Sequence, residues 1–424
     1  MTTEAPSQGG VEHRRRLPIV LTGPKPLESL LVTNTETRRG PKAAFAGLLF
    51  AAMGIAILPA ASLGILASFI IDDLEISRAK FGLLVAVINI AAAVFSPLVG
   101  RVTDRIGGRS ALLLLFGASA LFYVALGLVP SYFLLLVVGL AGAYAQASAN
   151  PATNKLIAGA LPAGERGVTT GVKQSGVQAG IFLAGLTLPS IALAFGWRAA
   201  YLLLALVPVL LLAVTPSVIP RASAGKRVGE RTSPARLPAD IWWLMVYGFL
   251  MGFAGAVTFL IPLFVEESLG LDPRVAGFTV AVIGFVAVGG RIVWSRYAEQ
   301  TDRFRLTLGL LAVISIGAVV GFWLAEYVTA WLILPAAVAL ALGSSSWNSV
   351  GMLAVITSAG AEATGRASGF VLLGFLTGLG VAPPIFGAIV DRTGQYDLMW
   401  LLSATALILA AAVTFAWGRS PTTR

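Results

Sequence analysis

The chain has 424 residues, of which 57% are apolar and only 12% are charged, and its formal net charge is +10. These proportions exclude a water-soluble globular protein of this length, because such a protein needs a charged surface to face water. The charged residues gather instead in short clusters between long uncharged stretches. We therefore predict that lipid surrounds most of the chain.

Residues suited to metal or redox chemistry are nearly absent. The chain has no cysteine, and its single histidine, His13, lies in the polar N-terminal segment. No disulfide, thiolate site or zinc site can be built from these residues. The apolar stretches also contain no HExxH motif and no paired aspartates. We predict no catalytic residue, no metal and no cofactor, so the chain is not expected to be an enzyme.

Twelve stretches are long and apolar enough to cross a membrane. A helix needs roughly 20 apolar residues to span the hydrocarbon layer. The predicted spans lie at residues 43–71, 81–100, 111–129, 131–152, 168–193, 199–220, 240–265, 277–295, 307–325, 329–353, 369–390 and 398–417. The predicted fold class is an all-α membrane protein with twelve transmembrane helices.

The distribution of Lys and Arg predicts the orientation, because positively charged loops resist translocation. With the N-terminus inside, the cytoplasmic side holds 24 of the 30 Lys and Arg residues, five lie outside, and one, Lys173, lies within a span. We expect a multi-pass protein of the cytoplasmic (inner) membrane with both termini in the cytoplasm. The pI of 10.2 reflects this topology and predicts no nucleic-acid partner.

Basic segments divide the chain into predicted domains. Residues 1–42 are expected to be a disordered cytoplasmic tail, and 418–424 a second, shorter tail. The cytoplasmic linker 221–239 separates an N-terminal half, 43–220, from a C-terminal half, 240–417, with six spans each.

The two halves show traces of a repeat, as duplicated transporters do. A shift of 198 residues places Ser148, Asn150, Gly171, Gly176 and Gly180 on Ser346, Asn348, Gly369, Gly374 and Gly378. In the fifth span Gly176, Gly180 and Ala184 recur at every fourth position. This small-residue pattern predicts close packing against a neighbouring helix.

The loop after the second span reads Gly100-Arg-Val-Thr-Asp104-Arg105-Ile-Gly107-Gly-Arg109. This motif resembles the signature of the major facilitator superfamily, and a degenerate copy, Ser295-Arg296-Tyr-Ala-Glu299, follows the eighth span. GWR at 196–198 and FGAIVDRTG at 386–394 are also typical of that family. The resemblance covers residues 43–417 and implies a secondary transporter with two pseudo-symmetric six-helix halves that works as a monomer.

The resemblance also implies a role for this loop. In the family the loop stabilises the outward-facing conformation, so conformational gating is the role expected for Gly100, Asp104, Arg105, Gly107 and Arg109. An aspartate can face a helix N-terminus, and an arginine can pair with acids or lipid phosphates. The alternative is a simple turn whose positive charge fixes the topology.

Polar side chains within spans indicate the substrate pathway, because a polar group facing lipid is penalised. In the fourth span Gln146, Asn150 and Asn154 share one helix face. The predicted substrate-binding residues are Lys173, Gln174, Gln178, Gln146, Asn150, Tyr144, Asn348, Asn89 and Arg291. The alternative role for the amides is hydrogen bonding between helices, worth about 1 kcal/mol or less each.

Two of these candidates are cations. Lys173 lies six residues past Gly167, roughly 9 Å into its helix. It is expected either to recognise an anion or serve as a coupling group, or to snorkel back to the headgroups. For Arg291 the alternative is a position at the edge of a loop. All 20 Asp and Glu fall in the tail, the loops or the span edges, so no buried carboxylate offers a counter-charge to a cation.

These features predict a secondary active transporter that takes up a small organic anion by alternating access. Its partners would be the small-molecule substrate and the lipid bilayer, and a coupling ion, proton or sodium, stays open. The alternative is an exporter of drugs or metabolites. A receptor without transport activity is the other class left open, and an uptake assay distinguishes it.

Overall fold

A computed structural model describes residues 39–161, 166–220 and 237–419. Residues Met1–Lys42 form one unit and Ala43–Arg424 a second one, and the second unit is described below. The predicted tail 1–42, most of the linker 221–239, most of the tail 418–424 and the side chain of Arg366 lie outside the described part.

Every element in the described part of the chain is a helix, and twelve segments are long and apolar enough to cross a membrane. The N-terminal half contains α1 (Arg39–Ile65), α2 (Ala67–Leu74), α3 (Arg78–Ile106), α4 (Gly108–Leu128), α5 (Tyr132–Ala160), α6 (Arg166–Phe195) and α7 (Trp197–Val218). The C-terminal half contains α8 (Ala239–Gly255), η3 (Ala256–Phe259), α9 (Ile261–Glu267), α10 (Pro273–Thr301), α11 (Phe304–Tyr327), η4 (Ala330–Leu332), α12 (Ile333–Leu342), α13 (Trp347–Thr393) and α14 (Asp397–Arg419). The predicted all-α fold with twelve spans is confirmed.

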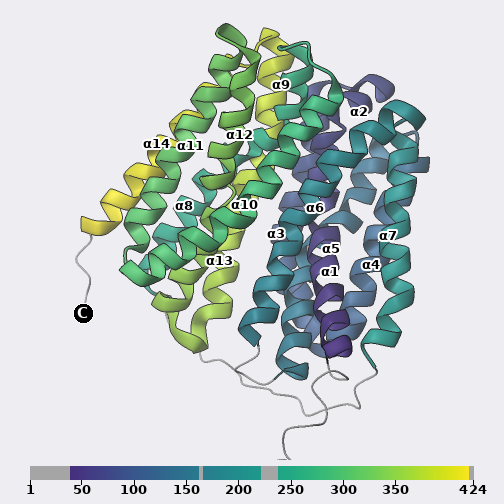
Figure 1. Cartoon of the computed structure of the whole chain (residues 1–424), viewed down its shortest axis with the longest axis vertical. Helices are drawn as coiled ribbons and strands as arrows, with labels where there is room; N and C mark the ends of the chain where they lie inside the picture. The colour runs from purple at the N-terminus through teal and green to yellow at the C-terminus, as the bar shows by residue number, and fades with distance from the viewer. Residues whose placement is uncertain (1–38, 162–165, 221–236, 420–424) are drawn as a thin grey trace, which may run out of the picture. The chain divides into compact units, whose positions relative to one another are not determined.

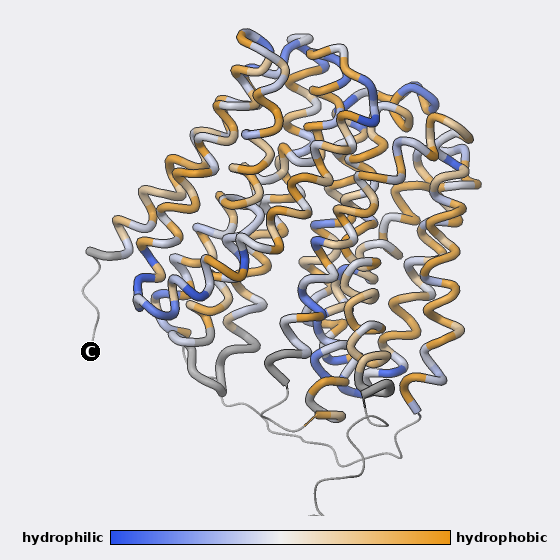
Figure 2. Tube along the Cα trace, in the orientation of Figure 1, coloured by the Kyte–Doolittle hydropathy of each residue, from blue (hydrophilic) through white to orange (hydrophobic). Residues whose placement is uncertain are grey.

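The outermost helices carry apolar surfaces. Helices α4 and α7 lie along one edge of the bundle and α11 and α14 along the other (Figure 1). Leu121, Leu210 and Phe415 on these helices are 60%, 64% and 69% exposed. Figure 2 shows mainly hydrophobic colouring along these edges, with hydrophilic stretches at helix ends and on inner helices. Such a surface suits lipid and not water.

Three spans are interrupted, which the sequence analysis did not predict. The first span breaks at Leu66, the seventh contains the 3₁₀ turn η3, and the tenth breaks at residues 343–346 between α12 and α13. The predicted tenth and eleventh spans, 329–353 and 369–390, imply a loop at residues 354–368. This is also wrong, because α13 continues through these residues. That stretch contains no proline and five alanines, so its composition does not end a helix.

Glycines bring equivalent helices together in the two halves. A Cβ atom at Gly176 would lie 2.0 Å from the carbonyl oxygen of Phe50 in α1. Its counterpart in the repeat, Gly374, faces α8, where a Cβ atom would lie 2.5 Å from the carbonyl oxygen of Met245. A side chain larger than hydrogen would not fit at either position. The close packing predicted for the glycine face of the fifth span is therefore confirmed.

The two halves meet through α3 with α13 and through α6 with α10. A Cβ atom at Gly82 would lie 2.4 Å from the carbonyl oxygen of Pro383, and one at Gly185 would lie 2.6 Å from that of Gly277. These contacts lie near the end of the bundle where α3 and α10 begin, which we name the far end. The tail end is the opposite one, where α1 and α8 begin (Figure 1).

The face of α3 that meets α13 is uncovered toward the tail end. Ile90 is the neighbour of Gly380 in α13. One and two turns further along α3, Val94 and Leu98 occupy the same helix face, and they are 58% and 54% exposed. The halves are thus in close contact at the far end, whereas toward the tail end this face is largely uncovered by the described residues.

Candidate functional site

Lys173 on α6 is the one fully buried charged side chain in the described part of the chain. Its Nζ atom donates to Asn154 Oδ1 at 2.6 Å, to Thr153 Oγ1 at 2.8 Å and to Asn150 Oδ1 at 3.3 Å. All three acceptors lie on α5. The ammonium group therefore turns into the N-terminal half, toward α5, and does not snorkel toward the tail end.

Gln174, the next residue on α6, extends this arrangement. Its Nε2 atom donates to Asn150 Oδ1 at 3.2 Å, so this oxygen accepts from two α6 side chains. The hydroxyl of Thr153 donates its own hydrogen bond to the carbonyl oxygen of Ala149 at 2.6 Å. We name Lys173, Gln174, Asn150, Thr153 and Asn154 the lysine cluster. Three of its members come from the predicted set of substrate-binding residues.

A second polar group lies between α3 and α5. Gln146 Nε2 donates to Asn89 Oδ1 at 3.2 Å, and the buried Asn89 donates to the carbonyl oxygen of Val85 at 3.0 Å. The hydroxyl of Tyr144 has no hydrogen-bond partner among the described residues. Tyr144 packs in an apolar cluster that includes Leu376 of α13, so its phenol lies where the two halves meet.

Gln178 and Asn348 lie apart from these groups. Gln178 is 2% exposed, and its Oε1 atom is buried without a partner in the described structure. A Cβ atom at Gly284 of α10 would lie 3.0 Å from its carbonyl oxygen, which marks the crossing of α6 and α10. Asn348 is half-buried in the first turn of α13.

Arg291 meets the break in the tenth span. Its Nε atom donates to the carbonyl oxygen of Ser345 at 3.0 Å, and Ser349 Oγ donates to the carbonyl oxygen of Arg291 at 3.3 Å. The break frees backbone carbonyls that a continuous helix would use, and a guanidinium group can satisfy them. Arg291 lies ten residues before the end of α10, about 15 Å along the helix. Arg291 therefore lies within α10 and not in the loop that follows it.

Lys173 and Arg291 come from different halves but lie at similar depths. From the crossing at Gln178 and Gly284, Lys173 is five residues and Arg291 seven residues toward the tail end. At about 1.5 Å per residue these steps correspond to roughly 8 Å and 10 Å along the helices. The two cations therefore flank the contact between the halves at nearly the same level.

Neither cation has an acidic partner in the described part of the chain. No carboxylate lies within ion-pairing distance of Lys173 or Arg291 among the residues that the structure describes. The oxygens around them belong to amides, hydroxyls and a backbone carbonyl. Positive charge at such positions, with only neutral groups around it, would attract an anion.

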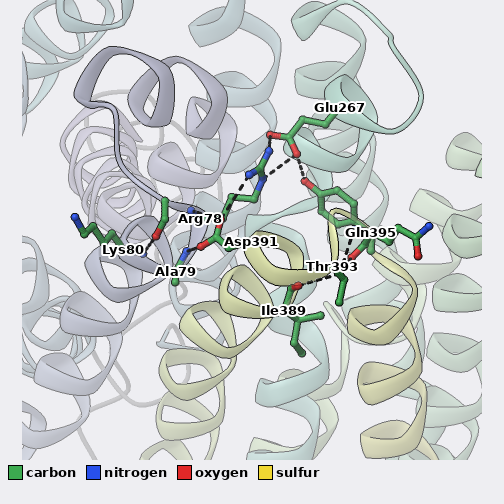
Figure 3. A network of polar contacts seen from close by, with 10 residues as sticks. Arg78, Ala79, Lys80, Glu267, Ile389, Asp391, Thr393 and Gln395 are labelled. Carbon is green, nitrogen blue, oxygen red and sulfur yellow. Dashed lines mark hydrogen bonds and ion pairs between the residues drawn. The ribbon is translucent and has the colours of Figure 1, made fainter.

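The far end of the bundle holds an ion-pair network between the halves (Figure 3). Arg78, at the start of α3, contacts both carboxylate oxygens of Glu267 at 3.0 and 2.8 Å. Asp391, near the end of α13, accepts the backbone N–H groups of Arg78 and Ala79 at 2.9 and 2.8 Å. Tyr396 donates to Glu267 at 2.6 Å. We name Arg78, Ala79, Glu267, Asp391 and Tyr396 the far-end latch.

The hydroxyl of Tyr396 remains a donor in this latch. Burial raises the pKa of Tyr396 above its ordinary value, and the nearby Glu267 carboxylate raises it further. The phenol therefore stays protonated at neutral pH and can donate its hydrogen bond. The latch thus contains a fixed donor as well as an ion pair.

The predicted gating loop makes its polar contacts within the N-terminal half. Lys155 on α5 donates to the side chain of Asp104 at 3.0 Å and to its carbonyl oxygen at 2.8 Å. Gly107 has φ of +85° and separates α3 from α4. Arg105 is exposed, and the Nε atom of Arg109 is buried without a partner in the described structure. A Cβ atom at Gly100 would meet open space.

The structure divides the predicted substrate-binding residues among several sites. It joins Lys173, Gln174 and Asn150, pairs Asn89 with Gln146, and places Arg291 on α10. Sequence reasoning missed Thr153, Lys155 and the far-end latch. The polar stripe of the fourth span could have pointed to Thr153 and Lys155, because both are direct neighbours of Asn154, which lies on that stripe. Nothing local in the sequence indicates the partners of Arg78.

Twelve membrane spans in two related halves, with buried polar groups on both sides of their contact, define a polytopic transport protein. The sequence profile of the Major Facilitator Superfamily matches residues 44–383. The chain belongs to this superfamily.

Relatives of the chain include transporters of different solutes. The probable sulfoacetate transporter of Cupriavidus necator is 25% identical over 84% of this chain and 89% of its own. The probable nitrate/nitrite transporter of Mycobacterium tuberculosis is 28% identical over 82% and 90%. The class D tetracycline resistance protein of Salmonella ordonez is 26% identical over 86% and 93%. These similarities establish solute transport as the function of the family and differ in the solute.

Among solved structures, the chain is similar to a bacterial homologue of the human lysosomal transporter Spinster in an inward-facing and occupied conformation. The TM-score is 0.75 at 16% sequence identity, over 90% of this chain and 98% of that one. This similarity supports the fold.

Proposed function

We propose that this protein is a secondary active transporter that takes a small organic anion into the cell by alternating access. The observation that carries the proposal is the pair of cations, Lys173 and Arg291, which lie at similar depth in different halves and have no carboxylate partner among the described residues. Burying an unpaired charge is strongly unfavourable. An anionic substrate would supply the missing counter-charge in each transport cycle.

The arrangement at the two ends fits one state of such a cycle. We place the tail end in the cytoplasm, because the basic segments that resist translocation attach there. The far-end latch then closes the outer side, and the uncovered face of α3 lies on the inner side. In the opposite state the latch would open and the loop at 100–109 would hold the inner side closed, as the family resemblance implies.

Uptake of an anion needs an energy source. The inside of a cell is negative, and moving one negative charge inward against 100 mV costs about 2.3 kcal/mol. Co-transport of a proton or a sodium ion would offset this cost. No carboxylate lies centrally in a span. A buried Asp or Glu is therefore not proposed as the proton carrier.

Two of the relatives support an anionic substrate, and one does not. Sulfoacetate and nitrate are anions, which agrees with the two unpaired cations. The tetracycline resistance relative favours the second candidate, an exporter of drugs. The described part of the chain has no carboxylate in the middle of a span, and Glu266, which has a buried carboxylate oxygen, lies at the end of α9. A cationic drug would therefore find no counter-charge at the level of Lys173 and Arg291, so the charge distribution favours the anion.

The proposal is tested by uptake into proteoliposomes that contain the purified protein. Acetate, sulfoacetate, nitrate, sorbitol and ethidium are compared under imposed proton and sodium gradients. We expect uptake of at least one anion, a loss of at least tenfold in Arg291→Ala and partial retention in Arg291→Lys. Arg274→Ala serves as the matched control, because Arg274 is an exposed arginine on the same helix, and it should behave as wild type.

Two results would contradict the proposal. Transport of ethidium or sorbitol alone would favour the exporter or another substrate class. Unchanged anion uptake by Arg291→Ala would remove the role of that cation.

A further inference from the structure

The ammonium group of Lys173 is fully engaged. It carries three N–H donors and no acceptor, and three oxygens from Asn150, Thr153 and Asn154 surround it. The side chain is 0% exposed. A substrate could reach Nζ only by displacing one of these oxygens, so direct contact between Lys173 and an anion is unfavourable in this arrangement.

The same hydrogen bonds fix the orientation of two amides. Because an ammonium group only donates, the amide oxygens of Asn150 and Asn154 must face Lys173, and their Nδ2 groups must face the other way. Gln174 donates to the same oxygen of Asn150 and holds that amide a second time. Neither Nδ2 group donates to a described residue.

These two Nδ2 groups lie on the accessible side of the lysine cluster. Asn154 is exposed and Asn150 is partly exposed, whereas Lys173 behind them is buried. Asn150 and Asn154 are one turn apart on α5, and such residues have Cβ atoms about 5 to 6 Å apart on one helix face. Two N–H donors at this spacing match two oxygens of one carboxylate or sulfonate group.

We propose that Asn150 and Asn154 contact the anionic group of the substrate through their Nδ2 atoms, while Lys173 is a positioning residue behind them. This inference rests on the proposed function and specifies its recognition site in the N-terminal half. Lys173 does two things for the site: it orients the amides, and its positive charge favours a negative ligand on their far side. Weak screening at membrane depth strengthens both effects.

A purely structural role for the cluster gives a different expectation, because Lys173 also joins α6 to α5. Asn154→Asp separates the two roles. The aspartate keeps an oxygen for Lys173 and adds an ion pair, so a structural link is preserved. It also removes the Nδ2 donor and neutralises the charge that the substrate would sense.

The experiment measures KM and Vmax for acetate and sulfoacetate in proteoliposomes, together with thermal unfolding of each purified variant. We expect Asn154→Asp to raise KM at least tenfold without lowering the unfolding midpoint. Asn154→Ala, which adds no charge, should raise KM several-fold. Gln300→Glu is the charge-matched control, since Gln300 is exposed near the end of α10, and it should retain the wild-type KM.

A wild-type KM in Asn154→Asp or Asn154→Ala would overturn the inference and leave the proposed function standing. If the wild-type protein takes up no anion under any gradient, the proposed function fails and this inference fails with it. The two failures are thus distinguishable in one set of proteoliposomes.

Discussion

Asp391 accepts the backbone N–H of Arg78 at 2.9 Å, although 313 positions separate the two residues in the chain. A carboxylate at the end of α13 thereby caps the first turn of α3, where N–H groups have no partner within the helix and the helix dipole favours a negative charge. Because α3 and α13 belong to different halves, this cap holds the far end closed.

Replacing Asp391 by alanine should shift the protein away from this conformation. A helix cap contributes about 0.5 to 2 kcal/mol, so the balance between conformations should change by roughly twofold to thirtyfold. The chain has no cysteine, which allows a single reporter. In a Leu98→Cys background, we expect Asp391→Ala to slow maleimide labelling from the tail end by that factor.

Asp397→Ala provides the matched control for this measurement. Asp397 is another carboxylate at the far end, but it accepts from Trp323 and Tyr327 of α11 within one half. Its loss should lower thermal stability and leave the labelling rate of Leu98→Cys unchanged. Equal slowing in both variants would show that the effect is not specific to contact between the halves.

Asp104→Asn should act in the opposite direction. The carboxylate of Asp104 is 80% exposed beside Lys155, so their ion pair contributes about 1 kcal/mol or less here. If the loop at 100–109 stabilises the opposite conformation, loss of the Asp104–Lys155 ion pair should speed labelling of Leu98→Cys severalfold with little change in the unfolding midpoint. Slower labelling would contradict the gating role proposed for this loop.

Tyr396→Phe removes the hydrogen bond to Glu267 from the latch. Tyr396 and Glu267 both belong to the C-terminal half, so this hydrogen bond acts on the contact between the halves by holding Glu267 in place for Arg78. We expect a loss of up to about 1 kcal/mol, seen as a slowing of Leu98→Cys labelling by up to about fivefold. Since the pKa of Tyr396 is raised, its neutral form persists through the ordinary titration range of a tyrosine near pH 10. The contribution of this hydrogen bond should therefore be constant between pH 7 and 9. A fall in the effect of Tyr396→Phe across that range would contradict a protonated phenol.

Gly176→Ala should strongly destabilise the protein. The added Cβ atom would lie 2.0 Å from the carbonyl oxygen of Phe50, and backbone displacement in a packed interior costs about 1 to 3 kcal/mol or more. Gly171→Ala, on the same helix with open space around it, is the control. Thermal unfolding in detergent should show a lower midpoint for the first variant alone, and equal midpoints would refute the packing.

The sequence could predict what depends on local composition and helical periodicity. Hydropathy located the twelve spans, and four-residue spacing placed Gly176 and Gly180 on a packing face and Asn150 and Asn154 on one stripe. Contacts that depend on how helices rotate and cross could not be predicted in this way. The three oxygens around Lys173 and the cap of Asp391 on Arg78 depend on tertiary packing. The helix break at residues 343–346, beside Arg291, contains no proline from which it could be predicted.

The most direct test of an anion-binding transporter is ligand-dependent thermal unfolding of the purified wild-type protein. A ligand at about 100 times its dissociation constant stabilises the state that binds it by about 2.7 kcal/mol. We predict that acetate, sulfoacetate or nitrate raises the unfolding midpoint in a saturable manner and that sorbitol and ethidium do not. Stabilisation by ethidium or sorbitol, with no effect of any anion, would contradict the account.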